Sequence, residues 1–472
     1  MKTLFNDGWS FSELAIDEKT MYKGDNIVLF EPDQFYERAG TLGYEPVRIP
    51  HDWQIYHVKD LYKNSVGFYK KSFELSPEQI EGRHNAIRFE GIYMNSAVWV
   101  NGKKAGEWKY GYATFEYDIS NLVKTGCNEI LVIAVYQNCN TRWYSGAGIF
   151  RDVTFINKPA VHLTTDGLYF TARPVDASKL NGKWNVSISV EAAGKIDGHK
   201  IENTISTPEG TVFARSKSLL APIPLDDEEI EWMHKNVSGL VDDSISRAGE
   251  ELEVENPRLW DTDSPFFYIL TSRFYDKDGN VIDEQSVHCG FKYAEFTSDR
   301  GFFLNGRHIK IYGACHHHDH GILGSAFDVN ALRRQFNRLK EMGVNSIRCS
   351  HNPPPSAWMD LCDEIGLMVD DESFDMWEKN KTPFDYANYF NEWCERDVAA
   401  WVRRDRNHPS LIMWSIGNEI NDTHEGNGFE ITKRLYSFVV KNDPNRNAPI
   451  TSASNYMMGE GAQKCATQLD VV

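Results

Sequence analysis

The chain has 472 residues, of which 41% are hydrophobic and 13% aromatic, and its formal net charge is -18. This length allows about three domains of ~150 residues each. The acidic balance argues against nucleic acid or an anionic membrane surface as a partner, because both repel negative charge. No run of about 18 apolar residues occurs, so no membrane span is expected.

The eight cysteines are scattered, and none lies in a C-x-x-C pair. In a chain of this length such cysteines are typical of reduced, buried thiols. No apolar stretch of signal-peptide length follows Met1. A cytoplasmic location is therefore expected, and a signal peptide removed from the chain is left open.

Residues 1–160 carry the pattern of an all-β domain. Residues 68–75 alternate in polarity, and short apolar strands are expected at 85–90, 96–100 and 129–136. Asn101-Gly102, between the apolar run 97–100 and the Lys-rich stretch that follows it, is typical of a type I′ hairpin turn. Many short strands separated by turns predict a jelly-roll β-sandwich.

Residues 161–295 predict a second sandwich. Residues 184–190 alternate, and two apolar runs flank Asp278-Gly279-Asn280, which indicates another hairpin. The acidic stretch 226–229 is expected to be a solvated loop. The length of about 130 residues suits an immunoglobulin-like sandwich.

Residues 296–472 alternate between strand and helix patterns, which predicts a (β/α)8 TIM barrel. Strands are expected at 309–313, 344–348, 367–369, 411–416, 450–452 and 470–472, with helices between them. The count reaches about six of the eight strands, so the barrel is expected to be incomplete at its C-terminal end.

The stretch 406–419 carries the chemistry that we expect of this barrel. Its apolar run 411–416 predicts a buried parallel strand, and it stops at Asn418-Glu419. Active sites of barrels lie at the carboxyl ends of the strands, and burial there can raise the pKa of a carboxyl group for acid catalysis. The alternative is that Glu419 caps the next helix or pairs with an arginine.

This stretch resembles the acid/base signature of glycoside hydrolase family 2, the family of β-galactosidases, β-glucuronidases and β-mannosidases. Further similar segments follow in the same order along the chain. They are 49–53 (IPHDW), 142–151 (RWYSGAGIFR), 256–260 (NPRLW), 345–354 (NSIRCSHNPP) and 371–375 (DESFD).

The resemblance implies a jelly-roll sugar-binding domain, an immunoglobulin-like domain and a catalytic barrel. It implies Glu419 as the catalytic acid/base, with Asn418, His317, His351 and Asp375 as substrate-binding residues. It places the nucleophilic glutamate beyond residue 472. The alternatives are a turn role for Asn418, a structural role for His351 and a helix N-cap for Asp375. Asn140 and Arg142 stay outside the predicted site, because the alignment of their loop is ambiguous by a residue or two.

Four histidines within residues 316–320 raise the alternative of a metal site. Their spacing matches no usual zinc motif, and consecutive side chains on a strand point in different directions. The histidine that some family members use for magnesium after the third strand is also absent here. No metal and no cofactor are therefore expected.

The predicted function is that of a retaining glycoside hydrolase for terminal β-linked sugars, with β-galactosides as the favoured substrates. A β-glucuronidase or another β-uronidase of the same family is one alternative. A non-catalytic carbohydrate-binding protein on this scaffold is an alternative from a different class. The expected partner is a carbohydrate substrate, and a homo-oligomer is left open.

Overall fold

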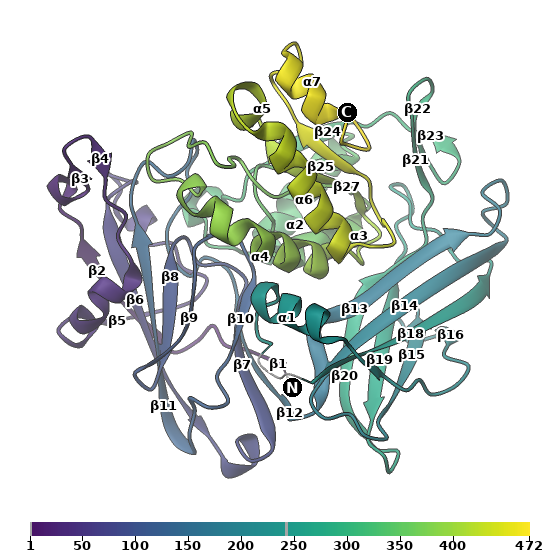
Figure 1. The fold of residues 1–472 in the computed structure, drawn as a ribbon, viewed down its shortest axis with the longest axis horizontal. Coiled ribbons are helices and arrows are strands. Elements are labelled where there is room, and N and C mark those ends of the chain that lie inside the picture. The colour runs from purple at the N-terminus through teal and green to yellow at the C-terminus, as the bar shows by residue number, and fades with distance from the viewer. Residues whose placement is uncertain (1, 241–243) are drawn as a thin grey trace.

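The computed structural model describes residues 2–240 and 244–472. Figure 1 shows two β-sandwiches side by side, with a parallel sheet and its helices lying across them. The predicted order of a jelly roll, an immunoglobulin-like sandwich and a barrel domain is confirmed. Within the described residues, no helix is long and apolar enough to cross a membrane.

The first sandwich packs a four-stranded sheet against a six-stranded sheet. The smaller sheet contains β1 (Lys2–Leu4), β12 (Val153–Pro159), β7 (Arg83–Phe89) and β10 (Phe115–Asp118). The larger sheet contains β5 (Glu45–Val47), β2 (Trp9–Ala15), β6 (Ser65–Leu75), β11 (Gly126–Tyr136), β8 (Ser96–Val100) and β9 (Lys103–Trp108). Asn101 and Gly102 join β8 to β9 with φ of 49° and 79°, as the predicted type I′ turn requires.

Several smaller elements lie in the loops of this domain, and one lies in a loop of the barrel. They are the strands β3 (Tyr22–Lys23) and β4 (Asn26–Ile27) and the 3-10 helices η1 (Glu18–Thr20), η2 (Pro32–Gly40), η3 (Gln54–Tyr56), η4 (Pro77–Gln79) and η5 (Gly321–Leu323).

The second sandwich has two four-stranded sheets. One contains β13 (His162–Pro174), β14 (Lys183–Ala193), β18 (Ile245–Glu255) and β17 (Ile223–Pro224). The other contains β16 (Val212–Arg215), β15 (Lys200–Ser206), β19 (Tyr268–Tyr275) and β20 (Val281–Cys289). The predicted hairpin at Asp278-Gly279-Asn280 joins β19 to β20.

The prediction of a loop at the acidic stretch 226–229 is wrong, because this stretch begins the helix α1 (Asp227–Asn236). The Asp226 side chain accepts a hydrogen bond from the Glu229 backbone N–H at 2.9 Å, which makes it the N-cap. Acidic side chains are favourable at this end of a helix, where the backbone N–H groups carry partial positive charge. The charge run is therefore a helix start.

A small antiparallel sheet leads into the barrel domain. It contains β21 (Ala294–Thr297), β22 (Gly301–Leu304) and β23 (Arg307–His308). The parallel sheet that follows contains β24 (Gly313–His316), β25 (Ser346–Cys349), β26 (Met368–Glu372), β27 (Leu411–Asn418) and β28 (Ile450–Ala453). Its helices are α2 (Val329–Glu341), α3 (Ser356–Ile365), α4 (Ala387–Asp405), α5 (Asp422–Glu425), α6 (Gly428–Asn442) and α7 (Glu460–Ala466).

Two strand predictions in this domain are wrong in detail. The first parallel strand begins at Gly313 rather than at residue 309, because the preceding apolar residues Ile309 and Ile311 pack into a small core beside Trp260. Residues 470–472 form no strand. There the Asp470 side chain accepts from the Ile450 N–H at 2.8 Å, so the segment folds back onto the start of β28.

The jelly roll and the barrel share one hydrophobic core. The Trp108 ring on β9 meets the Trp393 ring on α4 edge-on at 5.4 Å, and its indole N–H donates to the Asp397 carboxylate at 2.8 Å. Nearby, the Tyr110 hydroxyl donates to the Ser373 carbonyl just past β26. These contacts fix the first domain against the mouth of the barrel.

The immunoglobulin-like domain is fixed by the turn before β27. The Asn407 side chain accepts from the Phe170 N–H at 2.8 Å and donates to the Leu168 carbonyl at 2.9 Å, so it pairs with β13 as a strand would. Arg406 donates to the Asn442 carbonyl at 2.7 Å and to the Asp166 carbonyl at 3.1 Å. Both side chains are buried.

Replacing Asn407 with alanine should destabilise the protein by about 2–6 kcal/mol. The change leaves one buried N–H and one buried carbonyl of β13 without partners, at about 1–3 kcal/mol each. Chemical denaturation measures the free energy of unfolding. The exposed Asn330→Ala on α2 is the matched control and should change it by less than about 0.5 kcal/mol. Equal effects of the two changes would contradict the pairing described here.

Candidate active site

Asn418 and Glu419 lie at the carboxyl end of β27, where the chain leaves the parallel sheet. The Asn418 N–H donates to the Phe374 carbonyl at 2.9 Å, and the Glu419 N–H donates to the Ala453 carbonyl at 2.7 Å. Glu419 has a left-handed backbone with φ of 47°, which is uncommon for a residue other than glycine. The strand β28 and the segment just after β26 thus set the direction in which the Glu419 carboxylate leaves the sheet.

Asp375, which follows β26, is the centre of the polar network. Its side chain is 2% exposed. Its Oδ1 accepts from Arg142 Nη2 at 2.6 Å, from Asn418 Nδ2 at 2.7 Å and from Lys381 Nζ at 2.9 Å. A carboxylate with this many donors is held in one position. Its oxygens orient the residues around it, and it caps no helix.

Arg142 reaches this network from the jelly roll. Its Nη1 donates to Glu419 Oε2 at 2.9 Å, while Nη2 and Nε both donate to Asp375. One guanidinium therefore joins the two carboxylates across 277 residues of sequence. The planar fork of arginine suits such a double contact better than a lysine would.

Arg142 changes the pKa of Glu419. Its hydrogen bond lowers the pKa of Glu419 below the usual value, with burial opposing and the charges of Arg142 and Lys381 adding to the shift. The Glu419 side chain is 40% exposed, so solvent and a ligand can reach it. In this arrangement Glu419 is a carboxylate at neutral pH.

A second buried carboxylate, Glu372 at the end of β26, orients the next part of the site. It is 0% exposed and accepts from Arg348 Nη2 at 2.8 Å and from Ser415 Oγ at 2.6 Å. His351 Nδ1 lies 2.7 Å from its other oxygen. Arg348 also donates to Asn418 Oδ1 at 2.7 Å, which fixes the amide of Asn418 from both sides.

Three rings form a wall beside these polar groups. The Trp143 ring, from the same jelly-roll loop as Arg142, lies 5.3 Å from His317 and 5.5 Å from His351, measured between ring centroids. The two histidine rings are 5.5 Å apart. Burial, followed by the charge of His351, lowers the pKa of His317, so its imidazole is neutral at pH 7. A neutral imidazole beside an indole can both hydrogen-bond and stack against a sugar.

The other histidines of the 316–320 segment point away from this wall. His316 Nε2 lies 3.2 Å from Gln335 on α2, and His318 Nε2 lies 3.0 Å from the Ser145 carbonyl. Burial lowers the pKa of His316 to about 4 and that of His318 to about 3. These side chains diverge, as expected for consecutive residues of an extended segment.

The structure brings all five predicted site residues to one edge of the parallel sheet. They are Glu419, Asn418, His317, His351 and Asp375. Their individual roles stay predictions. The predicted site did not include Arg142, Trp143, Arg348, Glu372 or Lys381. The available signal was the resemblance itself, because four of these residues lie within its segments 142–151, 345–354 and 371–375, and only Lys381 lies outside them.

Two sandwiches followed by a parallel α/β domain, with a carboxylate at a strand end and a jelly-roll loop beside it, define a multidomain glycosidase scaffold. Comparison with family models gives the same division. Residues 7–159 match the sugar binding domain, 168–292 the middle domain and 297–469 the TIM barrel domain of glycosyl hydrolases family 2. The chain belongs to glycoside hydrolase family 2.

Individual relatives agree with this assignment. The chain is 35% identical to Beta-galactosidase BoGH2A of Bacteroides ovatus, over 96% of this chain and 54% of that protein. It is 33% identical to a putative beta-glucuronidase of Formosa agariphila, over 94% of this chain and 39% of that protein. A solved family 2 structure from Bacteroides cellulosilyticus superimposes with a TM-score of 0.82 at 31% identity, covering 100% of this chain and 58% of that one. The chain thus spans about half the length of these relatives.

Replacing Arg142 with glutamine should raise the pKa of Glu419. The change removes the hydrogen bond and the positive charge that favour the ionised form. Carbon-13 NMR titration of the glutamate side-chain carboxyls measures this pKa, and the signal of Glu419 is the one lost in Glu419→Gln.

The matched control for this titration is Arg300→Gln. It removes an exposed arginine whose partner is Glu295, 3.1 Å away on a surface hairpin. That change should leave the pKa of Glu419 where it is in the parent protein. An unchanged pKa in Arg142→Gln would contradict the ion pair described here.

Proposed function

We propose that this chain carries the acid/base half of a retaining β-glycosidase that acts on terminal β-galactosides. Glu419 donates a proton to the leaving glycosidic oxygen in the first step. In the second step it takes a proton from the water that releases the sugar from the nucleophile. The nucleophilic glutamate, predicted beyond residue 472, belongs to the same proposal.

The observation that carries the proposal is the position of Glu419. It is a partly exposed carboxylate at the end of β27. The other two carboxylates of the described site, Asp375 and Glu372, are buried, and each accepts several hydrogen bonds. Asp375 is 2% exposed and Glu372 is 0% exposed. Neither is free to exchange a proton with a ligand, so Glu419 is the member of the described site that suits acid/base work.

The charge balance of the described site favours an uncharged sugar. Arg142 pairs with Asp375 and Glu419, Lys381 pairs with Asp375, and Arg348 pairs with Glu372. A uronic acid would need a cation for its carboxylate, and each of these cations already has a carboxylate partner. This supports a β-galactoside over a β-glucuronide.

Two alternatives have support of their own. A β-glucuronidase is the second candidate, because the relative from Formosa agariphila is named a putative beta-glucuronidase. The wall of Trp143, His317 and His351 would also suit a protein that binds carbohydrate without cleaving it. We propose a cytoplasmic enzyme, on the sequence expectation given above.

Glu419→Gln in the full-length protein should slow substrates with poor leaving groups by about 10²–10⁴-fold, the usual contribution of a general acid. Aryl glycosides with activated leaving groups need little protonation, so their first step should lose much less. Steady-state and single-turnover kinetics on both substrate types measure this difference. Glu425→Gln, an exposed residue on α5, is the matched control and should keep the parent rates. Equal loss on both substrate types would show that Glu419 has a structural role.

The sugar is tested with an aryl β-galactoside and an aryl β-glucuronide that share one leaving group. We expect a higher kcat/KM for the galactoside, because the described site offers no unpaired cation to a uronate. A higher value for the glucuronide would replace the proposal with the uronidase alternative. Binding of galactose without turnover of either substrate would support the carbohydrate-binding alternative.

A further inference from the structure

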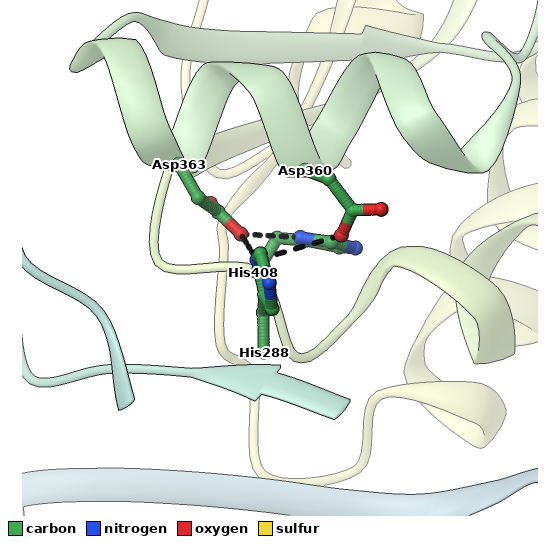
Figure 2. Close-up of side chains that lie close together, drawn as sticks. All are labelled: His288, Asp360, Asp363 and His408. Carbon is green, nitrogen blue, oxygen red and sulfur yellow. Dashed lines mark hydrogen bonds and ion pairs between the residues drawn. The ribbon is translucent and has the colours of Figure 1, made fainter. Parts of the chain in front are cut away.

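Four side chains with metal-ligating atoms converge between the immunoglobulin-like domain and the barrel. Figure 2 shows His288 rising from β20, Asp360 and Asp363 descending from α3, and His408 between them from the turn before β27. Their nearest ligand atoms all lie within 4.8 Å of one another. Among the described residues, this is the one group of three or more such side chains at this spacing.

The ligand atoms lie close enough together to share one small cation, and two of the contacts among them are hydrogen bonds to Asp363. His288 Nδ1 lies 3.1 Å from Asp363 Oδ2 and 3.4 Å from Asp360 Oδ1, and His408 Nδ1 lies 2.6 Å from Asp363 Oδ2. In a tetrahedral zinc site with bonds of about 2.0–2.2 Å, neighbouring ligand atoms are separated by about 3.3–3.6 Å. The distance from His288 to Asp360 is already in this range, and the two hydrogen bonds to Asp363 Oδ2 would lengthen by up to about 1 Å as the ion replaced their protons.

The group is more than a buried ion pair. Asp363 and His408 alone would form a familiar contact between a carboxylate and a protonated histidine, but that pair does not require the other two side chains. His288 and Asp360 come from different elements and direct their own ligand atoms to the same place. Two imidazoles and two carboxylates form a donor set that zinc uses in proteins.

The surroundings hold these side chains in position. The Ser410 N–H donates to Asp363 Oδ1 at 3.0 Å, which leaves Oδ2 directed at the two histidines. The His288 ring stacks on Phe267 at 4.1 Å between ring centroids. Metal sites depend on such supporting contacts to orient their ligands. The Asp360 side chain is 45% exposed whereas Asp363 is 0% exposed, so an ion can enter from the Asp360 side.

We propose that His288, Asp360, Asp363 and His408 form a structural binding site for a divalent transition-metal ion of the zinc type. The ion would join β20 of the second domain to α3 and the β27 turn of the barrel. The eight residues of β27 separate this site from Glu419 by about 25 Å at the rise of an extended strand. The site is thus distinct from the acid/base chemistry and does not depend on the proposed function.

The test uses the chain after removal of metals with a chelator and exchange into metal-free buffer. Titration with Co²⁺ should give the visible absorption bands of tetrahedral coordination and saturate at one ion per chain. Calorimetry with Zn²⁺ should give the same stoichiometry, and Zn²⁺ should raise the unfolding midpoint.

The double variant His288→Gln with Asp360→Asn removes two ligands and leaves the Asp363–His408 pair intact. It should bind Zn²⁺ at least about 10–100-fold more weakly and lose the cobalt bands. The matched control, His308→Gln with Asp299→Asn, makes the same chemical changes at exposed positions of the β21–β23 sheet and should bind as the parent does.

Circular dichroism verifies that each variant is folded, and Asp360→Asn alone gives a second, milder variant at a half-exposed position. Absence of cobalt bands in the parent chain would overturn the proposal. Bands or zinc binding that persist unchanged in both ligand variants would also overturn it, because the ion would then be bound elsewhere.

Discussion

The buried carboxylate of Asp375 is the constraint on which the site depends. It receives Arg142 from the first domain, Asn418 from β27 and Lys381 from the segment after β26. A buried charge of this kind is stable only while its partners remain, because an unpaired carboxylate in this position would be strongly unfavourable. The three segments are therefore held together by one group, and the position of Glu419 follows from them through Arg142.

This constraint explains why the jelly roll packs so closely on the barrel. The contacts of Trp108 and Tyr110 with α4 and with the end of β26 bring the loop of Arg142 and Trp143 to the strand ends. A shift of about 1 Å at that interface would break a double contact between arginine and two carboxylates. The first domain is thus part of the site, and its shared hydrophobic core with the barrel sets the precision of the polar network.

The sequence predicted features that depend on neighbouring residues. The turn at Asn101-Gly102 and the end of β27 at Asn418-Glu419 were both recognisable, because turn chemistry and the burial of a strand are local properties. Features that depend on distant residues could not be predicted from the sequence. The ion pair of Arg142 with Glu419 joins residues 277 positions apart, and the role of Asn407 depends on the unpaired backbone of β13. The acidic start of α1 was missed for a different reason, since charge alone does not distinguish a solvated loop from a helix N-terminus.

The pairing of Glu419 with Arg142 also constrains how the proposed chemistry can proceed. An acid must hold a proton at the working pH, yet the hydrogen bond from Arg142 lowers the pKa of Glu419. A nucleophilic carboxylate within about 5 Å, as a retaining mechanism requires, would oppose this effect by charge repulsion and raise the pKa. Once that carboxylate is esterified by the sugar, its negative charge is gone. The hydrogen bond from Arg142 then lowers the pKa of Glu419 without opposition from that charge. Glu419 would then be ionised in the step in which it must accept a proton, so Arg142 supports the second half of the reaction and the charge of the nucleophile supports the first.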